Sequence, residues 1–425
     1  MSRPFLNPVP LARLDARLAA LLLVLLVALV LTSAKANLQT DAVDYYAMVQ
    51  RLVGDAPPIL PHLPFVAQRS PGYPLLTLPL YYALGVAEPL TEVQPVRPPP
   101  GAPQPGAAPS ASEATLLPPW PLPLRHLFFK DFPLPPPAGV VRWRILAAML
   151  LTGYALCFAG LWLSARALGL LYPSLPGRSL LPLMVLTSPV FLHNLLQTPT
   201  YATLTAFGVA CWAAYAWMLA WQTDSPRAQA TSGAATGMLV LVRLETAVFA
   251  AALGVGLAAL RRWRFAAWYA AGGLVPLALL LAYHTAQFGN PWHAGVLRGT
   301  MNVLTFQPDY VLSALVGPQA GVIWHSPLIS LGIVGLVTGR LRELRVLGWG
   351  ALALVALILL RVPVMYFCIG EGTALVEGVV ITCPPDWQAM QRLLRLDVNR
   401  YVIPLAPFAA LGLRGLPARV YPLSA

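Results

Sequence analysis

Charged residues are scarce in this chain of 425 residues: Asp, Glu, Lys and Arg make up 10% of it, whereas hydrophobic residues make up 57%. An average soluble domain carries roughly a quarter charged residues, so the composition excludes a water-soluble surface over most of the chain. The sequence also has no Walker phosphate loop, no dinucleotide-binding glycine fingerprint and no serine nucleophile elbow. These absences argue against chemistry driven by a soluble nucleotide.

Cysteine is rare as well, with four residues in the chain. Cys157 and Cys211 lie inside apolar blocks, where a thiol behaves as a small hydrophobic group. Cys368 and Cys383 share one polar segment. A disulfide and two free thiols both stay open for this pair, because a single pair is a weak signal.

Histidine gives no metal motif. His284, His293 and His325 lack ligand spacing such as HxxxH, so structural roles are favoured and no metal site is predicted.

What the chain does contain is apolar blocks of about 15 to 25 residues, separated by short arginine-bearing segments. Because a helix rises about 1.5 Å per residue, such blocks are long enough to cross a bilayer, and they predict an all-α polytopic membrane bundle of about ten transmembrane helices. The predicted spans are Leu18–Thr32, Trp143–Ala165, Leu180–Leu196, Ala202–Trp221, Ser232–Leu244, Ala247–Leu260, Phe265–Tyr283, Val322–Val337, Val346–Val364 and Tyr401–Leu413.

The first block ends at Ser33-Ala34-Lys35-Ala36, which resembles the small-residue cleavage site of a signal peptide. A retained helix is the preferred interpretation, because the acidic motif just after it needs an anchor at the membrane face. A cleaved signal peptide is the alternative.

The distribution of charge predicts the orientation of the spans. When they alternate from an inside N-terminus, the inner segments carry fourteen arginines and three acidic residues, a net charge of +11, whereas the rest of the chain carries +1. This asymmetry is the positive-inside rule, and it accounts for the basic composition without a nucleic-acid partner. It predicts a multi-pass protein of the bacterial cytoplasmic (inner) membrane with its N-terminus inside.

The spans divide the chain into three parts. Within the first outer loop, residues 71–86 are predicted to form an interfacial helix, because counting them as a span would invert every later loop. The proline-rich insertion 89–137 is predicted to have little regular structure. The parts are a cytoplasmic N-terminus with the first helix (1–34), a large outer loop (35–142), and the remaining spans (143–425) with outer loops 284–321 and 365–400.

Acidic residues gather just after the first span, at Asp41-Ala-Val-Asp44-Tyr45. On a helix Asp41, Asp44 and Tyr45 share one side, so both carboxylates are predicted to face a common cleft at the membrane surface. The alternative is an N-cap aspartate with a solvated neighbour, since aspartate at a helix start accepts hydrogen bonds from free amides.

Cationic and aromatic residues mark the next candidates. Arg69 and Tyr73 belong to Arg-Ser-Pro-Gly-Tyr-Pro at the head of the interfacial helix, where an arginine meets either a phosphorylated ligand or a lipid headgroup. Arg243 and Glu245 interrupt an apolar region, where ionisable groups are costly unless paired or functional. The alternative for them is a short outer loop with an ordinary ion pair.

Near the end of the chain, Arg400 and Tyr401 lie at the outer mouth of the last span. The tyrosine fits the aromatic belt of a membrane protein. The arginine, with Arg69 and Arg243, is predicted to form a cationic pocket for phosphate or pyrophosphate.

The order of these features resembles the GT-C superfamily of polyprenyl-phosphate-sugar-dependent glycosyltransferases, especially protein O-mannosyltransferase-like and aminoarabinose-transferase-like bacterial proteins. The resemblance runs from the N-terminus to residue 413, and each motif is weak by itself. The motifs are Asp41 four residues before Tyr45, the segment from Arg69 to Pro74, the Arg243 span, Phe288-Gly-Asn-Pro291 with Gly295, Gly317-Pro-Gln-Ala-Gly321-Val-Ile-Trp324-His-Ser-Pro327, and Arg400-Tyr-Val-Ile-Pro404-Leu-Ala-Pro407.

The resemblance implies juxtamembrane helices over a bundle and a cavity for a lipid-linked sugar, which is the donor substrate. It implies that Asp41 is the general base, with Asp44 as the second catalytic candidate. Membrane lipids are the other expected partners, with neither nucleic acid nor a cofactor indicated and a divalent metal left open. The substrate-binding candidates are Arg69, Tyr73, Arg243, Glu245, Arg400 and Tyr401.

Two other classes of function compete with the enzyme. Many relatives have Asp-Glu where Ala42 follows Asp41 here, which keeps open a catalytically inactive GT-C-like accessory or scaffold subunit of a membrane complex. A transporter is less favoured, because the sequence shows few polar residues near mid-membrane and no evident pair of broken helices.

The orientation predicts the outcome of cysteine labelling. In a background without the native cysteines, a thiol placed at Pro105 should react with a membrane-impermeant maleimide on intact cells, because that loop is outside. A thiol at Arg262 should react only after the cells are permeabilised. The reverse pattern would contradict the whole predicted topology.

Overall fold

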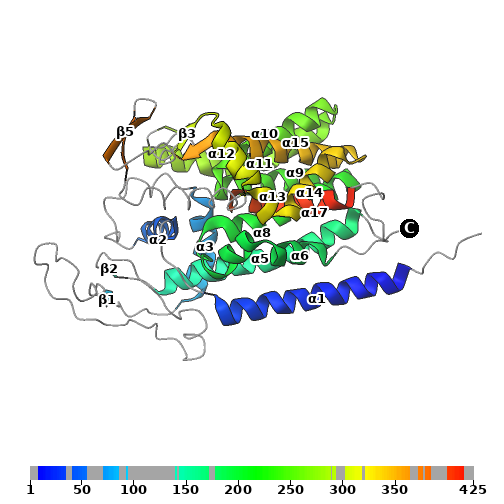
Figure 1. Cartoon of the computed structure of the whole chain (residues 1–425), viewed down its shortest axis with the longest axis horizontal. Helices are drawn as coiled ribbons and strands as arrows, with labels where there is room; N and C mark the ends of the chain where they lie inside the picture. Colours follow the sequence, from blue (N-terminus) through cyan, green and yellow to red (C-terminus); the bar gives the residue numbers. More distant parts are fainter. Residues whose placement is uncertain are drawn as a thin grey trace, which may run out of the picture.

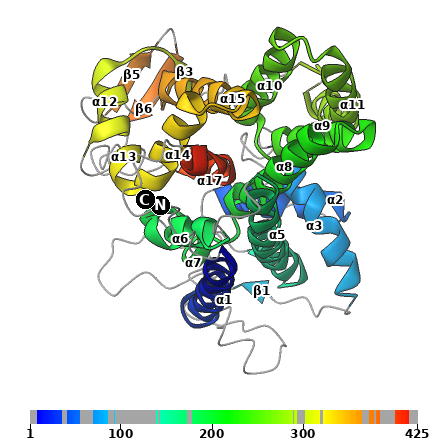
Figure 2. The same ribbon diagram turned by 90° about the vertical axis from the view of Figure 1, so that its right-hand side faces the viewer.

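A computed structural model of the chain describes residues 8–34, 41–54, 70–85, 92–93, 139–140, 143–171, 178–288, 290–292, 302–317, 321–363, 372–376, 379–383 and 400–415. Within these residues the regular structure is almost entirely helical, which confirms the predicted all-α class. Most helices run along one direction as a bundle, with α1 (Pro8–Ser33) along one side (Figure 1). Viewed along the bundle, α8 and α17 lie near its centre (Figure 2).

Among the described residues, five helices are long and apolar enough to cross a membrane. At about 1.5 Å per residue, roughly 20 residues span the hydrocarbon core of a bilayer. Large apolar side chains remain exposed on these helices, for example Leu274 and Val275 on α11, as expected of surfaces that meet lipid tails. The five apolar segments are Leu14–Ser33 in α1, Arg144–Leu171 in α5 (Trp143–Leu171), Ala202–Thr223 (α8), Trp263–Ala286 in α11 (Trp263–Phe288) and Arg342–Leu360 (α15).

The other predicted spans coincide with shorter helices, so ten spans are not confirmed. Three are single helices of 17, 13 and 10 residues: α9 (Pro226–Val242), α10 (Ala247–Ala259) and α17 (Ala406–Gly415). Two are interrupted, the first into α6 (Leu180–Thr187) and α7 (Pro189–Leu196), the second into α13 (Val322–His325) and α14 (Pro327–Thr338). A proline begins the second half of each, and proline removes an N–H and clashes with the preceding turn.

The two interruptions meet inside the bundle. The Oγ atoms of Ser188 and Ser326 lie 3.0 Å apart, and both residues are buried. Ser188 Oγ also accepts a hydrogen bond from the Phe191 amide at 3.3 Å, which caps α7. The fold therefore does contain a pair of broken helices, which corrects the expectation drawn from the sequence. Broken helices by themselves do not establish transport, because fold does not determine function.

Glycines bring the most closely packed helices together. In three helix pairs of the described residues, both helices contribute a glycine that lies against backbone atoms of the other helix. On α8, a methyl group at Gly208 would lie 2.3 Å from the Leu156 carbonyl oxygen of α5. Small residues permit such close backbone contact between helices in a membrane. The glycine pairs are Gly160 with Gly208 (α5 and α8), Gly233 with Gly272 (α9 and α11), and Gly332 with Gly412 (α14 and α17).

One end of the bundle collects arginine-bearing turns, and we call it the arginine end. Asp15 of α1 accepts hydrogen bonds there from the Arg178 amide at 2.8 Å and from Ser179 Oγ at 2.6 Å, which ties α1 to the start of α6. The ends of α5, α8 and α10 and the starts of α11 and α15 line one cavity, together with Arg262 and Arg340. The predicted alternation of spans puts all these helix ends on the same side of the membrane, and in the structure they lie at the same end of the bundle.

At the opposite end, which we call the strand end, α2 (Asp41–Leu52) and α3 (Gly72–Ala83) run across the bundle instead of along it (Figures 1 and 2). Helix α3 falls within the predicted interfacial helix 71–86. Apart from β1, the proline-rich insertion lies outside the described residues. The short antiparallel pairs are β1 (Glu92–Val93) with β2 (Gly139–Val140), β3 (Asn302–Leu304) with β4 (Arg361–Pro363), and β5 (Gly372–Val376) with β6 (Val379–Cys383), and α12 (Pro308–Val316) follows β3.

The glycine contact between α5 and α8 predicts a loss of stability in Gly208→Ala. The added methyl overlaps the Leu156 backbone, and overpacking of this kind costs about 1–3 kcal/mol. Thermal unfolding of the detergent-purified protein, followed by tryptophan fluorescence, should show a lowered midpoint.

Gly169→Ala on α5 is the matched control. Its methyl group would meet nothing within 4 Å, and alanine favours a helix over glycine by about 1 kcal/mol. The midpoint of this variant should stay level or rise. A Gly208→Ala protein as stable as the wild type would show that the two helices do not pack this closely.

Candidate functional site

A break between two apolar helices places Arg243 and Glu245 together. Helix α9 ends at Val242, Arg243 takes an extended backbone conformation, and the short turn η2 (Leu244–Thr246) leads into α10. Thr246 Oγ1 donates a hydrogen bond to the Arg243 carbonyl oxygen at 2.7 Å, which stabilises the turn. Two ionisable side chains therefore leave the chain next to each other inside an apolar region, where such groups mark candidate functional sites.

Glu245 forms a buried ion pair with Arg361, the first residue of β4 just after α15. Arg361 Nη1 lies 2.7 Å from Glu245 Oε1, and each side chain is 8% exposed. Burial raises the pKa of a carboxyl, but the Arg361 and Arg243 guanidiniums outweigh this effect and lower the pKa of Glu245 below its usual value. Glu245 is therefore a carboxylate at neutral pH.

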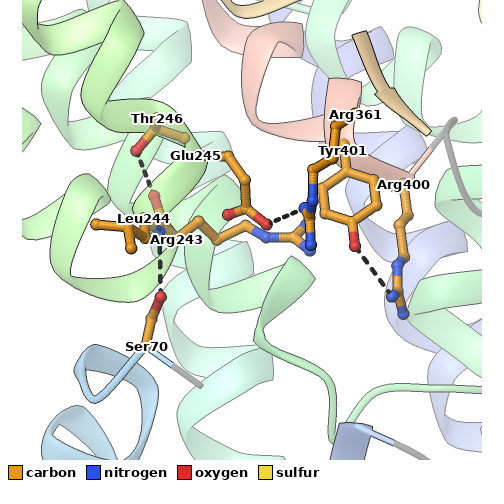
Figure 3. Close-up of polar contacts among 8 residues, drawn as sticks. All are labelled: Ser70, Arg243, Leu244, Glu245, Thr246, Arg361, Arg400 and Tyr401. Atoms are coloured by element: carbon orange, nitrogen blue, oxygen red, sulfur yellow. Dashed lines mark hydrogen bonds and ion pairs between the residues drawn. The ribbon is translucent and has the colours of Figure 1, made fainter. Parts of the chain in front are cut away.

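Tyr401 is surrounded by three arginines. The guanidinium carbon of Arg243 lies 4.4 Å from the centre of the Tyr401 ring, and those of Arg361 and Arg400 lie at 5.2 Å each. Arg400 also donates a long hydrogen bond of 3.4 Å to the tyrosine hydroxyl. In Figure 3 the ring lies between Arg361 and Arg400, with Arg243 reaching in beside Arg361. We call these three arginines, with Glu245 and Tyr401, the cationic cluster.

Two donors of the cationic cluster have no acceptor within the described residues. It contains three guanidinium groups and, within the described residues, one carboxylate. Arg243 Nη1 and Arg361 Nε are buried and make no hydrogen bond within the described part of the chain. Buried donors without acceptors are uncommon, and an unpaired one costs about 1–3 kcal/mol. Stacking on the tyrosine ring offsets part of the cost of burying these cations.

Two further contacts place the head of α3 beside the cationic cluster. Ser70 Oγ accepts a hydrogen bond from the Leu244 amide at 3.1 Å, next to Arg243 (Figure 3). A methyl group at Gly72 would lie 2.5 Å from the Leu241 carbonyl carbon, so α3 begins in direct contact with the end of α9. Arg69 itself lies outside the described residues, but its chain neighbour Ser70 is hydrogen-bonded to Leu244, the residue after Arg243.

The acidic candidates lie on α2. Asp41 begins this helix and its side chain lies outside the described part of the structure, so its predicted role as a base stays a prediction. Asp44 and Tyr45 are buried, but so are Tyr46, Ala47 and Val49, so burial does not distinguish one side of this helix and the predicted common cleft stays a prediction. Tyr45 packs edge-on against Tyr73 of α3, with ring centres 5.3 Å apart.

Tyr73 serves packing in this structure. Its ring is fully buried, and its hydroxyl donates a hydrogen bond of 3.0 Å to the Met149 carbonyl oxygen of α5. These contacts fix α3 against the bundle and thereby position Ser70.

The structure therefore brings together four of the predicted residues: Arg243, Glu245, Arg400 and Tyr401. It adds Arg361, which sequence reasoning missed because the residue fell inside the predicted span Val346–Val364. The signal was available, since an arginine within an apolar block is the feature that singled out Arg243. Helix α15 ends at Leu360, so Arg361 lies at the end of the apolar segment and not within it.

Other candidate chemistry is limited in the described residues, where no group of three His, Cys, Asp or Glu side chains is arranged to hold a metal ion. His284 Nδ1 lies 3.2 Å from the Pro291 carbonyl oxygen, which is a structural contact. His293 and Cys368 lie outside the described residues, as does the side chain of Cys383. The Cys368–Cys383 disulfide therefore stays a prediction.

Comparison of the chain with protein-family models finds no matching family, and comparisons with curated proteins and with solved structures find no match.

The buried ion pair predicts that Glu245→Gln is strongly destabilising. This change leaves Arg361 and Arg243 buried without their carboxylate, and removal of one partner of a buried pair costs about 3–5 kcal/mol. The midpoint of thermal unfolding should fall well below that of the wild type.

The double variant Glu245→Gln with Arg361→Met is the companion measurement. Removing the second charge should recover part of the lost stability, because a neutral, well-packed residue replaces an unpaired cation. If the loss of stability in the double variant equalled the sum of the losses in Glu245→Gln and Arg361→Met measured singly, Glu245 and Arg361 would not be coupled as the structure indicates.

Proposed function

We propose that the chain is a GT-C-like membrane glycosyltransferase that uses a polyprenyl-phosphate-linked sugar and transfers the sugar to an acceptor at the outer face of the membrane. The observation that carries this proposal is the cationic cluster, in which three arginines surround Tyr401 and two buried donors, Arg243 Nη1 and Arg361 Nε, have no acceptor within the described residues. Its excess of buried donors matches the chemistry of a phosphate or pyrophosphate group.

The proposal places the chain in a bacterial inner membrane as a bundle of ten crossing segments, with its N-terminus and arginine end in the cytoplasm. The five long apolar helices support the membrane setting. The gathering of arginine-bearing turns at one end supports the orientation, because Lys and Arg favour cytoplasmic loops. The cationic cluster then lies at the outer end of the bundle.

Arginine suits the proposed donor because its planar N–H groups bind phosphate oxygens two at a time. The buried Nη1 of Arg243 and Nε of Arg361 are the donors that have no acceptor within the described residues. The phosphate gains negative charge as the sugar departs. Fixed cations at this point therefore stabilise the transition state more than the ground state, which is the condition for catalysis.

In the proposed reaction, the oxygen of an acceptor hydroxyl attacks the anomeric carbon of the sugar. The bond from that carbon to the phosphate oxygen breaks, and the phosphate keeps the electron pair. A carboxylate takes the hydroxyl proton. We assign this role to Asp41, with Asp44 as the second candidate, on the strength of the resemblance to GT-C enzymes.

Helices α2 and α3 support a lipid-linked donor over a soluble one. They run across the bundle at its strand end, which is the orientation of helices that lie in a membrane interface. The buried residue Ser70 just before α3 is hydrogen-bonded to Leu244, which lies between Arg243 and Glu245 in the chain, while Tyr82 near the other end of α3 is 61% exposed. The phosphate of a lipid-linked donor at the cluster and its hydrocarbon tail beside α3 would therefore lie at neighbouring depths in the bilayer.

The proposal predicts that Arg400→Gln weakens donor binding. Loss of one charge-assisted hydrogen bond to phosphate costs about 1.5–3 kcal/mol, which corresponds to about a 10- to 150-fold higher dissociation constant. The measurement is titration of the purified protein in nanodiscs with a short-chain polyprenyl-phosphate sugar, and Arg69→Gln should behave in the same way. Arg166→Gln is the matched control, because Arg166 also stacks on an aromatic ring, 3.9 Å from the centre of Trp162, but is exposed on α5.

Asp41→Asn separates catalysis from binding. It keeps the shape of the side chain but removes the proton acceptor, so turnover with a radiolabelled donor should fall by roughly a hundredfold or more while donor binding survives. Donor binding by Arg400→Gln at wild-type affinity would refute the phosphate role of the cluster. Binding without transfer in every variant and in the wild type would favour the accessory subunit.

A further inference from the structure

A second cationic site lies at the arginine end, far along the bundle from the cationic cluster. A cavity of about 620 Å³ opens there among the ends of five helices. Helices α5, α8 and α10 finish at it, whereas α11 and α15 begin at it. Its volume falls in the range of about 300–1,000 Å³ that is typical of small-molecule sites.

The rim of the cavity is basic. Arg262, Arg340 and Arg342 line it and are exposed, and one acidic residue, Glu343, accompanies them. None of the three arginines makes an ion pair within the part of the chain that the structure describes. The guanidinium carbon of Arg262 lies 5.0 Å from the centre of the Trp221 ring, so a cation–π contact orients this arginine at the rim.

Part of the wall of the cavity is apolar, with Leu171, Met218 and Leu260 contributing near the ends of α5, α8 and α10. The Nε1 of Trp221 is buried and has no acceptor within the described residues. The first turns of α11 and α15 add the partial positive charge of helix N-termini. A free inorganic anion would use the arginines but not the apolar wall. A ligand that uses both has an anionic head and a hydrocarbon body.

We propose that this cavity binds the phosphodiester headgroup of an anionic phospholipid, with an acyl chain against Leu171, Met218 and Leu260. The cavity lies where the long apolar helices end, which is the depth of lipid headgroups, and basic side chains at that depth attract anionic lipids. The proposal does not depend on the glycosyltransferase proposal, because its residues belong to the opposite end of the bundle.

The test is thermal unfolding of the detergent-purified full chain with three additions: phosphatidylglycerol, phosphatidylcholine and inorganic phosphate. Phosphatidylglycerol should raise the unfolding midpoint in a concentration-dependent manner, because a ligand that binds only the folded state stabilises it. Phosphatidylcholine and inorganic phosphate at the same concentration should not. An equal effect of phosphatidylcholine would overturn recognition of an anionic headgroup, and an equal effect of phosphate would overturn the role of the lipid tail.

Variants then locate the binding. The double change Arg262→Gln with Arg340→Gln should raise the phosphatidylglycerol concentration needed for half the shift by about tenfold or more. Arg227→Gln is the matched control, since Arg227 is exposed in the first turn of α9 but does not line the cavity, and it should respond like the wild type.

Glu343→Gln gives a readout of opposite sign. Removal of the one carboxylate among the described residues that line the cavity should lower the phosphatidylglycerol concentration needed, so the proposal stays testable even if the double arginine variant does not fold. A response of Glu343→Gln equal to that of Arg227→Gln, or an unchanged response of the double variant, would overturn the assignment of lipid to this cavity.

Discussion

Inside a bilayer there is no water to satisfy the peptide groups, so each N–H and C=O must find its partner within the protein. This requirement favours helices, and the long apolar segments of the chain form them. It also explains how the interruptions are built. Where Pro189 begins a new helix, the Ser188 hydroxyl accepts from a backbone amide and contacts Ser326 at the other interruption. Threonines such as Thr152 and Thr236 return their hydroxyl groups to carbonyls one turn earlier.

The same scarcity of water makes arginine behave differently at the two ends of the bundle. At the arginine end Arg262, Arg340 and Arg342 are exposed, so their charges cost little and remain open to headgroups. At the strand end Arg243 and Arg361 are buried, and a carboxylate and a tyrosine ring only partly compensate them. One residue type therefore supports two kinds of site, and burial makes the difference between them.

The sequence predicted the positions of the apolar helices well, because hydrophobic runs and bracketing arginines are local signals. The distribution of arginines among the loops also predicted that residues 71–86 form a helix that is not a span, and α3 lies within this range. It missed the interruptions at Ser188 and Ser326, since Pro189 and Pro327 lie inside strongly apolar runs that dominate any window average. The ion pair of Glu245 with Arg361 joins residues 116 positions apart, and no local pattern encodes such a contact. The hydrogen bonds from Arg178 and Ser179 to Asp15, which join α1 to the segment before α6, were hidden for the same reason.

The cationic cluster draws its members from separate parts of the bundle: Arg243 follows α9, Arg361 follows α15, and Arg400 precedes α17. Helices α9 and α17 belong to different glycine-packed pairs, one with α11 and the other with α14. Repulsion among the three guanidiniums is therefore also a force that pushes these pairs apart. An anion among the arginines reverses the sign of that force. If the cluster binds an anion as proposed, its occupancy and the spacing of the two pairs are linked equilibria, and each can be read by measuring the other.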